Sequence, residues 1–332
     1  MTNRDGEAPR EGWPLYNVRQ TFATTTGFFA SIPKLPGSNY PELQNRGYES
    51  VIAGIPHFLG FKLKVGNQTY DSDMDLKTIT NFNTTLNMKD GLNTWRFTWS
   101  PRDHNISLNM ELVTLVHRTQ DNRAATQMQI TAEGGDVNCT IIDIFDGRSA
   151  VRSSLLRKGL SDNSSSMYIS LHPERQPNTI AYLTSTANVS NGYTDESSRR
   201  PVEDLSEGNM TIGQAWDVRL MEGKPAMFTK FVGIATTDQF PEDAEETSRE
   251  ESLGAYRDGF DAILVPHTKE WNKIMAPHHF TSYRNPTSGL LPNDSVIRSH
   301  QAGATSHHYN TLQSIRPSRA RADTGVAVSS LL

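Results

Sequence analysis

The sequence predicts a mainly β protein, a large antiparallel β-sandwich followed by a helical region. From Phe58 to about Ile234, short segments with alternating apolar and polar residues are separated by Gly, Asn, Asp and Ser turns. This span shows no helical period of comparable quality. The pattern switches near Thr236, where an acidic stretch precedes a helical one. This order of elements indicates sheets packed face to face, with helices added after them.

Aromatic residues take alternating positions in the run Thr94–Pro101. Trp95, Phe97 and Trp99 fall on one face of the expected strand, because successive side chains of a strand point to opposite faces. Their alternation with polar residues favours a buried core face. Stacking on a sugar is the alternative for the two tryptophans.

Two earlier stretches are less regular. The aromatic clusters of Gly12–Phe29 are typical of one or two N-terminal strands, and sugar stacking by Trp13 or Tyr16 is the alternative. The stretch Gly47–Phe58 contains the apolar pair Val51-Ile52, which we expect to be buried, before the chain turns at Gly54-Ile55-Pro56.

The helical region begins with the acidic run Phe240–Glu246, as a helix N-terminus prefers. One apolar stripe is expected along a helix that reaches Leu264, formed by Leu253, Tyr256, Phe260 and Leu264. Pro266 should break or kink this helix, and Lys269–Met275 should continue it. Thr281–Pro292 is interpreted as a linker and Asp294–Ile315 as weakly helical, whereas Ser318–Leu332 has no periodicity.

Composition excludes several classes of function. The chain has 332 residues, 36% of them hydrophobic, and a formal net charge of −5, which gives no reason to expect a nucleic-acid partner. No apolar run is long enough for a membrane span. Cys139 is the only cysteine, so no internal disulfide can form, and we expect it to be a small buried apolar residue.

N-glycosylation sequons are about twice as frequent as the roughly four that chance would give, and they point to the secretory pathway. The eight candidate asparagines are Asn67, Asn83, Asn105, Asn138, Asn163, Asn188, Asn209 and Asn293. The polar start Met1–Arg10 is not a signal peptide. Either the protein is cytosolic and its sequons are unused, or its true N-terminus lies upstream.

Motifs of catalysis and ligand binding are scarce. The sequence has no nucleophile elbow, phosphate-binding glycine loop or His-Glu-x-x-His motif. The pairs His278-His279 and His307-His308 lack the spacing that a helix uses to hold a metal, so we predict no metal site and no cofactor. The basic residues Arg316, Arg319 and Arg321 are interpreted as a solvated tail.

Paired carboxylates are what a glycosidase requires, and Glu49, Asp143 and Asp146 are the acidic residues that the sequence brings forward. Each has a structural alternative. Glu49 can bond local backbone, and Asp146-Gly147 is typical of a turn after the strand Cys139–Phe145. We therefore predict none of them as catalytic.

Several segments, in order, resemble the fungal acid trehalases of glycoside hydrolase family 65, over roughly residues 11–328. These segments are Gly12–Phe29, GYESVIAGIP at Gly47–Pro56, Ile79–Pro101, DGRSAVR at Asp146–Arg152, Phe231–Gly233, HTKEW at His267–Trp271, LPND at Leu291–Asp294, and Tyr309 with Leu312-Gln313. The resemblance implies a super-β-sandwich of the galactose-mutarotase-like kind, a helical linker and an (α/α)6 barrel. The implied boundaries are 11–238 for the sandwich, 239–290 for the linker and 291–332 for the first part of an incomplete barrel.

The resemblance also implies hydrolysis of α,α-trehalose to glucose with inversion, by two glutamates of the barrel, in a secreted, cell-wall or vacuolar protein. No position here matches either glutamate, so no catalytic residue is assigned. We expect a chain truncated at both ends and inactive by itself, whose full-length form acts on trehalose or a related α-glucoside. A non-catalytic carbohydrate-binding sandwich and a relative of the family's disaccharide phosphorylases are the alternatives, and the oligomeric state stays open.

Overall fold

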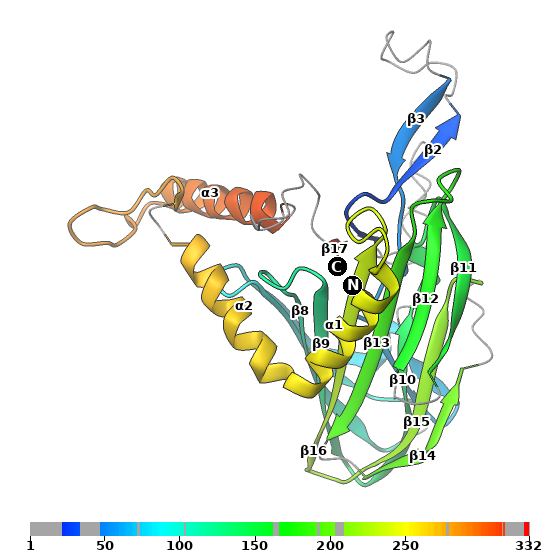
Figure 1. The fold of residues 1–332 in the computed structure, drawn as a ribbon. Coiled ribbons are helices and arrows are strands. Elements are labelled where there is room, and N and C mark those ends of the chain that lie inside the picture. Colours follow the sequence, from blue (N-terminus) through cyan, green and yellow to red (C-terminus); the bar gives the residue numbers. More distant parts are fainter. Residues whose placement is uncertain are drawn as a thin grey trace.

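The computed structural model describes residues 22–33, 47–71, 74–102, 104–161, 166–190, 193–202, 209–276, 279–313, 315 and 329–331. Two antiparallel sheets pack face to face, and helices lie outside the larger one (Figure 1). The predicted mainly β sandwich followed by helices is confirmed.

The larger sheet has eight strands in the order β11-β12-β13-β16-β9-β8-β7-β6. Their bounds are β6 Ile79–Asn87, β7 Leu92–Trp99, β8 Ser107–Val116, β9 Arg123–Glu133, β11 Ser153–Leu160, β12 Ser166–Pro173, β13 Ala181–Ser190 and β16 Pro225–Thr236. Most neighbours are joined by short turns, so the sheet is largely a series of hairpins.

The smaller sheet has five strands in the order β14-β15-β10-β4-β5. They are β4 Phe61–Val65, β5 Gln68–Tyr70, β10 Val137–Phe145, β14 Tyr193–Pro201 and β15 Ile212–Leu220. Two short pairs complete the strands: β1 Phe22–Thr24 pairs with β17 Ser329–Leu331, and β2 Phe29–Pro33 pairs with β3 Tyr48–Ile52. Residues 329–331 therefore form a strand where the sequence shows no periodicity.

The core lies between the two sheets and contains the aromatic row of β7. Phe97 and Trp99 are 3% and 1% exposed, and half-buried Trp95 packs against the same cluster. Cys139 is buried there as well. The core interpretation of these residues is confirmed, which leaves Trp99 no face for a sugar.

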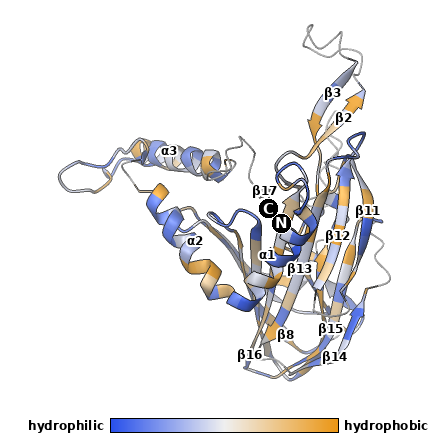
Figure 2. Cartoon of the chain, viewed as in Figure 1, coloured by the Kyte–Doolittle hydropathy of each residue, from blue (hydrophilic) through white to orange (hydrophobic). Residues whose placement is uncertain are grey.

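The β2–β3 hairpin projects from the body of the sandwich (Figure 1), and hydrophobic residues lie along it (Figure 2). Phe29, Tyr48 and Ile52 are 39%, 53% and 43% exposed, and Val51 is only half-buried. The expectation that Val51-Ile52 is buried is wrong, because this hairpin extends beyond the second sheet that would have covered it.

Helix α1 (Ala244–Asp258) lies against β13 and β16 with a face of small residues. Its buried positions are Ala244, Ser248, Ser252 and Ala255. The predicted stripe is wrong for Leu253, which is half-buried, and for Tyr256, which is 38% exposed. The reason is close approach, because a Cβ on Gly233 of β16 would lie 1.9 Å from the Ser248 carbonyl oxygen.

The helical stretch breaks at Gly259 rather than at Pro266. Gly259 has φ 83°, a conformation that favours glycine, and α2 (Phe260–Ile274) then runs through Pro266. The carbonyl of Ala262, which loses its partner to the proline, lies on an exposed face where water can bond it. Phe260 and Leu264 do pack against the sheet, as predicted.

Helix α3 (Ser295–Gln313) follows the irregular segment 281–294, as the sequence predicts. No helix in the described ranges is long and apolar enough to cross a membrane.

Candidate functional site

Asp143 lies in a buried ion pair at the centre of the sandwich. Its carboxylate is 2.7 Å from Nζ of Lys230, and both side chains are 0% exposed. Ser185 and Gln214 donate to its second oxygen at 2.7 and 3.0 Å. Lys230 also donates to the Ile144 carbonyl at 2.6 Å, and burial lowers the pKa of its ammonium group. A carboxylate so enclosed cannot reach a glycosidic bond, so its role is structural.

The sequence does not single out Lys230 as a candidate residue. The only signal was a lysine inside the apolar strand β16, where a charge needs a partner. The partner lies on the other sheet, and nothing local in the sequence identifies it.

Asp146 closes the turn after β10, as predicted. It accepts hydrogen bonds from the backbone and the guanidinium of Arg148, at 2.9 and 2.6 Å. Burial pushes the pKa of Asp146 up, but the Arg148 hydrogen bonds outweigh it and hold the pKa below its ordinary value. Glu49 lies on the projecting strand β3. The three nominated carboxylates therefore occupy three different settings and form no acid–base pair.

Two of the segments that carry the family resemblance meet in space. The stretch after β3 threads along the turn that follows β10, where Ser149 donates to the Ile55 carbonyl at 2.6 Å. Ser153 donates to the Gly54 carbonyl at 2.7 Å, and the Gly54 amide donates to the Val151 carbonyl at 2.8 Å. A Cβ on Gly54 would lie 2.0 Å from the Ser149 carbonyl oxygen. The two motifs thus specify a close backbone contact.

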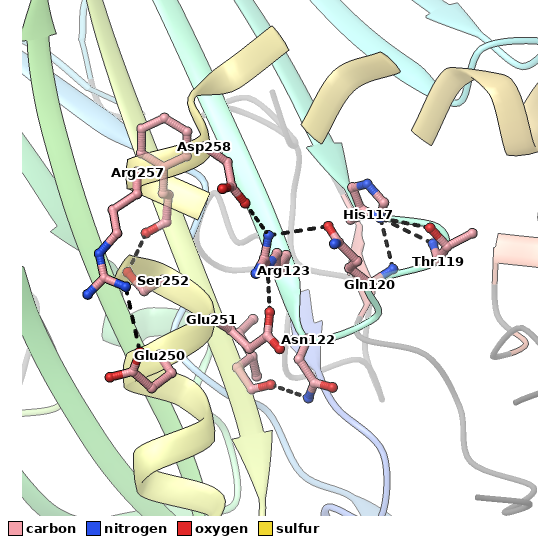
Figure 3. A network of polar contacts seen from close by, with 12 residues as sticks. His117, Thr119, Gln120, Asn122, Arg123, Glu250, Glu251, Ser252, Arg257 and Asp258 are labelled. Atoms are coloured by element: carbon pink, nitrogen blue, oxygen red, sulfur yellow. Dashed lines mark hydrogen bonds and ion pairs between the residues drawn. The ribbon is translucent and has the colours of Figure 1, made fainter. Parts of the chain in front are cut away.

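A polar network ties the turn between β8 and β9 to α1 (Figure 3). Arg123 bonds Glu251 and, at 3.0 Å, Asp258, two acidic residues of α1. His117 accepts the backbone N–H of Gln120 at 2.9 Å on its Nδ1. The network holds the helix on the sheet with charges that sequence alone could not pair.

The same turn holds α2 and α3. His267 of α2 accepts the Arg118 backbone N–H on Nδ1 at 3.2 Å, and its Nε2 is 3.0 Å from the Gly91 carbonyl. This arrangement is that of a neutral imidazole whose Nε2–H donates to Gly91. Arg118 donates from one guanidinium nitrogen to the Leu312 and Ile315 carbonyls, both at 2.7 Å, at the end of α3.

Trp271 completes this junction. Its ring lies 4.7 Å from that of Tyr309 on α3, and the Arg118 guanidinium lies 5.3 Å above it. His267 and Trp271 are both buried, so the HTKEW segment joins the helices to the turns of the larger sheet. The junction positions backbone elements and contains no exposed reactive group.

The remaining candidates are scattered. His308 lies 3.1 Å from the Ile274 carbonyl and stacks on Phe280, whereas His307 is exposed. Over the described positions, no group of three or more His, Cys, Asp or Glu residues could hold a metal ion. Seven residues named from the sequence lie outside the described ranges, namely Trp13, Tyr16, Asn163, His278, Arg316, Arg319 and Arg321.

The sequon asparagines share one property. Each of the seven that the structure describes has an exposed side chain, namely Asn67, Asn83, Asn105, Asn138, Asn188, Asn209 and Asn293. Asn83, Asn138 and Asn188 lie within strands, whose successive side chains alternate between the two faces of a sheet, and all three lie on the exposed face.

An open groove of about 790 Å³ lies on the outer face of the five-stranded sheet. Polar side chains of β4, β10, β14 and β15 line it, together with half-buried Val202, which packs on the buried Ile142 and Ala215. Two guanidinium nitrogens of Arg200 donate to the Asp217 carboxylate at 2.8 and 3.0 Å, and the Thr140 hydroxyl donates to the same carboxylate at 2.9 Å.

The fold and these contacts define a sandwich domain with helices docked on its larger sheet. A solved structure described as a putative kojibiose phosphorylase from the human microbiome has this fold, with a TM-score of 0.60 at 13% identity, over 74% of this chain and 31% of that one.

A model of the N-terminal domain of glycosyl hydrolase family 65 matches residues 6–274. The acid trehalase of Emericella nidulans is 35% identical over 307 residues, which cover 91% of this chain and 29% of that protein. The cell wall acid trehalase of Arthroderma benhamiae is 33% identical over the same shares. The chain therefore belongs to glycosyl hydrolase family 65 and is a relative of the fungal acid trehalases. It spans about three tenths of the length of these relatives.

Proposed function

We propose that this chain is the N-terminal sandwich portion of an α,α-trehalase, and that it carries and orients a helical catalytic domain without taking part in bond cleavage. The observation behind this proposal is the colinear identity of 35% with an acid trehalase over 91% of the chain. In the proposed enzyme, two glutamates of an (α/α)6 barrel hydrolyse trehalose with inversion, one as general acid and one as general base. The proposed boundaries are 11–238 for the sandwich and 239–290 for the linker, with the barrel from 291.

The junction of Arg118, His267 and Trp271 supports the scaffold role. It fixes the end of α3 to turns of the larger sheet through buried hydrogen bonds and ring contacts. A barrel that continues from α3 would inherit its orientation from these contacts. The proposed compartment is the cell wall, the secreted space or the vacuole, and the relatives from Arthroderma benhamiae and Candida albicans are named cell wall acid trehalases.

Incubation of the purified chain with trehalose at acidic pH, followed by a glucose assay, tests the proposal. We expect no glucose from this chain alone, and glucose when it replaces the matching segment of the Emericella nidulans enzyme. The unmodified enzyme and the same enzyme lacking that segment are the controls. Turnover by the chain alone would refute the scaffold role.

Calorimetry with trehalose, maltose and a glucan separates this proposal from a carbohydrate-binding sandwich. We expect no binding heat, because the candidate stacking residue Trp99 is buried and Trp95 packs against the core. In a full-length version that carries its own barrel, a requirement for inorganic phosphate would instead indicate a phosphorylase.

A further inference from the structure

We propose that an N-linked glycan on Asn138 folds back into the groove of the five-stranded sheet and covers that face. The inference rests on the proposed secretory route, because attachment takes place there. In the attachment step, Nδ2 of Asn138 forms a bond to the anomeric carbon of a lipid-pyrophosphate-linked oligosaccharide. The bond from that carbon to the pyrophosphate breaks, the lipid pyrophosphate leaves, and Nδ2 loses one proton.

The acceptor belongs to the groove itself. Asn138 is exposed, opens the sequon Asn138-Cys139-Thr140, and is one of the residues that line the groove. Because side chains alternate along β10, Asn138, Thr140 and Ile142 share the outer face. A glycan that follows this row passes from its attachment point toward half-buried Val202, which packs on Ile142, over about 13 Å of strand.

The lining suits a sugar better than a protein segment. The groove presents hydrogen-bonding groups for hydroxyls, on Lys64, Thr140, Arg200, Asp217 and Arg219. In the part of the chain that the structure describes, none of the exposed large hydrophobic side chains lines the groove.

Tethering makes weak contacts sufficient. A glycan attached to a residue of the groove lining meets the groove at a high effective concentration, so each contact needs little affinity of its own. Asn188, on β13 of the larger sheet, is exposed in the same way but does not line the groove, which makes it a matched control.

The test uses the full chain secreted from a fungal host. Glycopeptide mass spectrometry maps the occupied asparagines, and endoglycosidase is then applied to the folded protein. We expect Asn138 to be occupied and its glycan to be released several-fold more slowly than the glycan on Asn188. Arg200→Ala, which alters the groove but not the sequon, should speed release at Asn138 alone.

A second measurement, by hydrogen exchange, reports on the face of the five-stranded sheet that the glycan covers. Hydrogen exchange in β10, β14 and β15 should be faster in Asn138→Gln than in the wild type, and unchanged in Asn188→Gln. Glycans at other sites with none on Asn138, or equal release rates at Asn138 and Asn188, would overturn the groove proposal alone. A chain without glycans at any site would overturn the secretory route as well.

Discussion

His267 should make the folded chain less stable in acid. Burial lowers the pKa of its imidazole from 6.5 to about 4, and the nearby Arg118 guanidinium acts in the same direction. The Gly91 carbonyl and Asp90 oppose these two effects without overcoming them. The replacement His267→Gln tests the effect, because glutamine can accept from Arg118 and donate to Gly91 but does not titrate.

The sign follows from the two pKa values. Between about pH 6.5 and pH 4 the unfolded chain binds a proton that the folded chain does not, so stability falls as pH falls through this window. Titration of His267 costs almost no stability above pH 7. It lowers the free energy of unfolding by about 2 kcal/mol at pH 5 and by about 3 kcal/mol below pH 4. Protonation would also break a contact, because a protonated Nδ1 can no longer accept the Arg118 backbone N–H.

Urea unfolding at pH 7.5 and pH 5 measures this effect. His267→Gln should cost some stability at pH 7.5, and its deficit relative to the wild type should shrink by about 2 kcal/mol at pH 5. His307→Gln, at an exposed position of α3, is the matched control and should follow the wild type. Parallel curves for wild type and His267→Gln across this range would refute the reasoning.

Three further substitutions test the contacts described above. Lys230→Met should lower the free energy of unfolding, measured by urea unfolding, by about 3–5 kcal/mol, because it leaves the Asp143 carboxylate buried without its cation. Adding Asp143→Asn should restore most of this loss, because it removes the unpaired charge. Gly233→Ala should cost about 1–3 kcal/mol in the same assay, because its Cβ would force α1 away from β16. Arg118→Met should speed hydrogen exchange in α3 and proteolysis in the segment 281–294, because the end of α3 loses both guanidinium hydrogen bonds.

Each of these has a control in the chain. Lys224→Met removes an exposed lysine, Gly303→Ala adds a Cβ that meets nothing within 4 Å, and Arg257→Met removes an exposed arginine near α2. Lys224→Met and Arg257→Met should leave stability and α3 exchange near the wild type, and Gly303→Ala should not lower stability, because alanine is the better helix former at this exposed position of α3. A Lys230→Met cost equal to that of Lys224→Met, or intact α3 protection in Arg118→Met, would contradict the corresponding contact.

The sequence predicts those parts of the fold that depend on alternation. Trp95, Phe97 and Trp99 were assigned to the core because a strand presents every second residue to one face, and the larger sheet confirms it. The face of α1 was missed because it consists of Ala and Ser. Ser248 and Ser252 bond carbonyls and hydroxyls of β13 and β16, a pattern that hydrophobic periodicity does not register.

Ion pairs between distant segments cannot be predicted from the sequence for a different reason. The partner of Lys230 lies on the other sheet, and those of Arg123 lie on α1, so neither pair follows from local spacing. The sequence predicts a break or kink at Pro266, but the helical stretch breaks at Gly259. A proline prevents only one helical hydrogen bond when its ring fits, whereas Gly259 adopts a positive φ that other residues rarely take.

The segments that carry the family resemblance are better explained by packing than by chemistry. Gly54 has no room for a Cβ beside the Ser149 carbonyl, and the hydroxyls of Ser149 and Ser153 bond the backbone around it. The histidine and tryptophan of HTKEW are buried against turns of the larger sheet and against α3. Motifs built this way fix the positions of backbone segments. That is the pattern a scaffold requires, since its contribution to catalysis would be the placement of another domain.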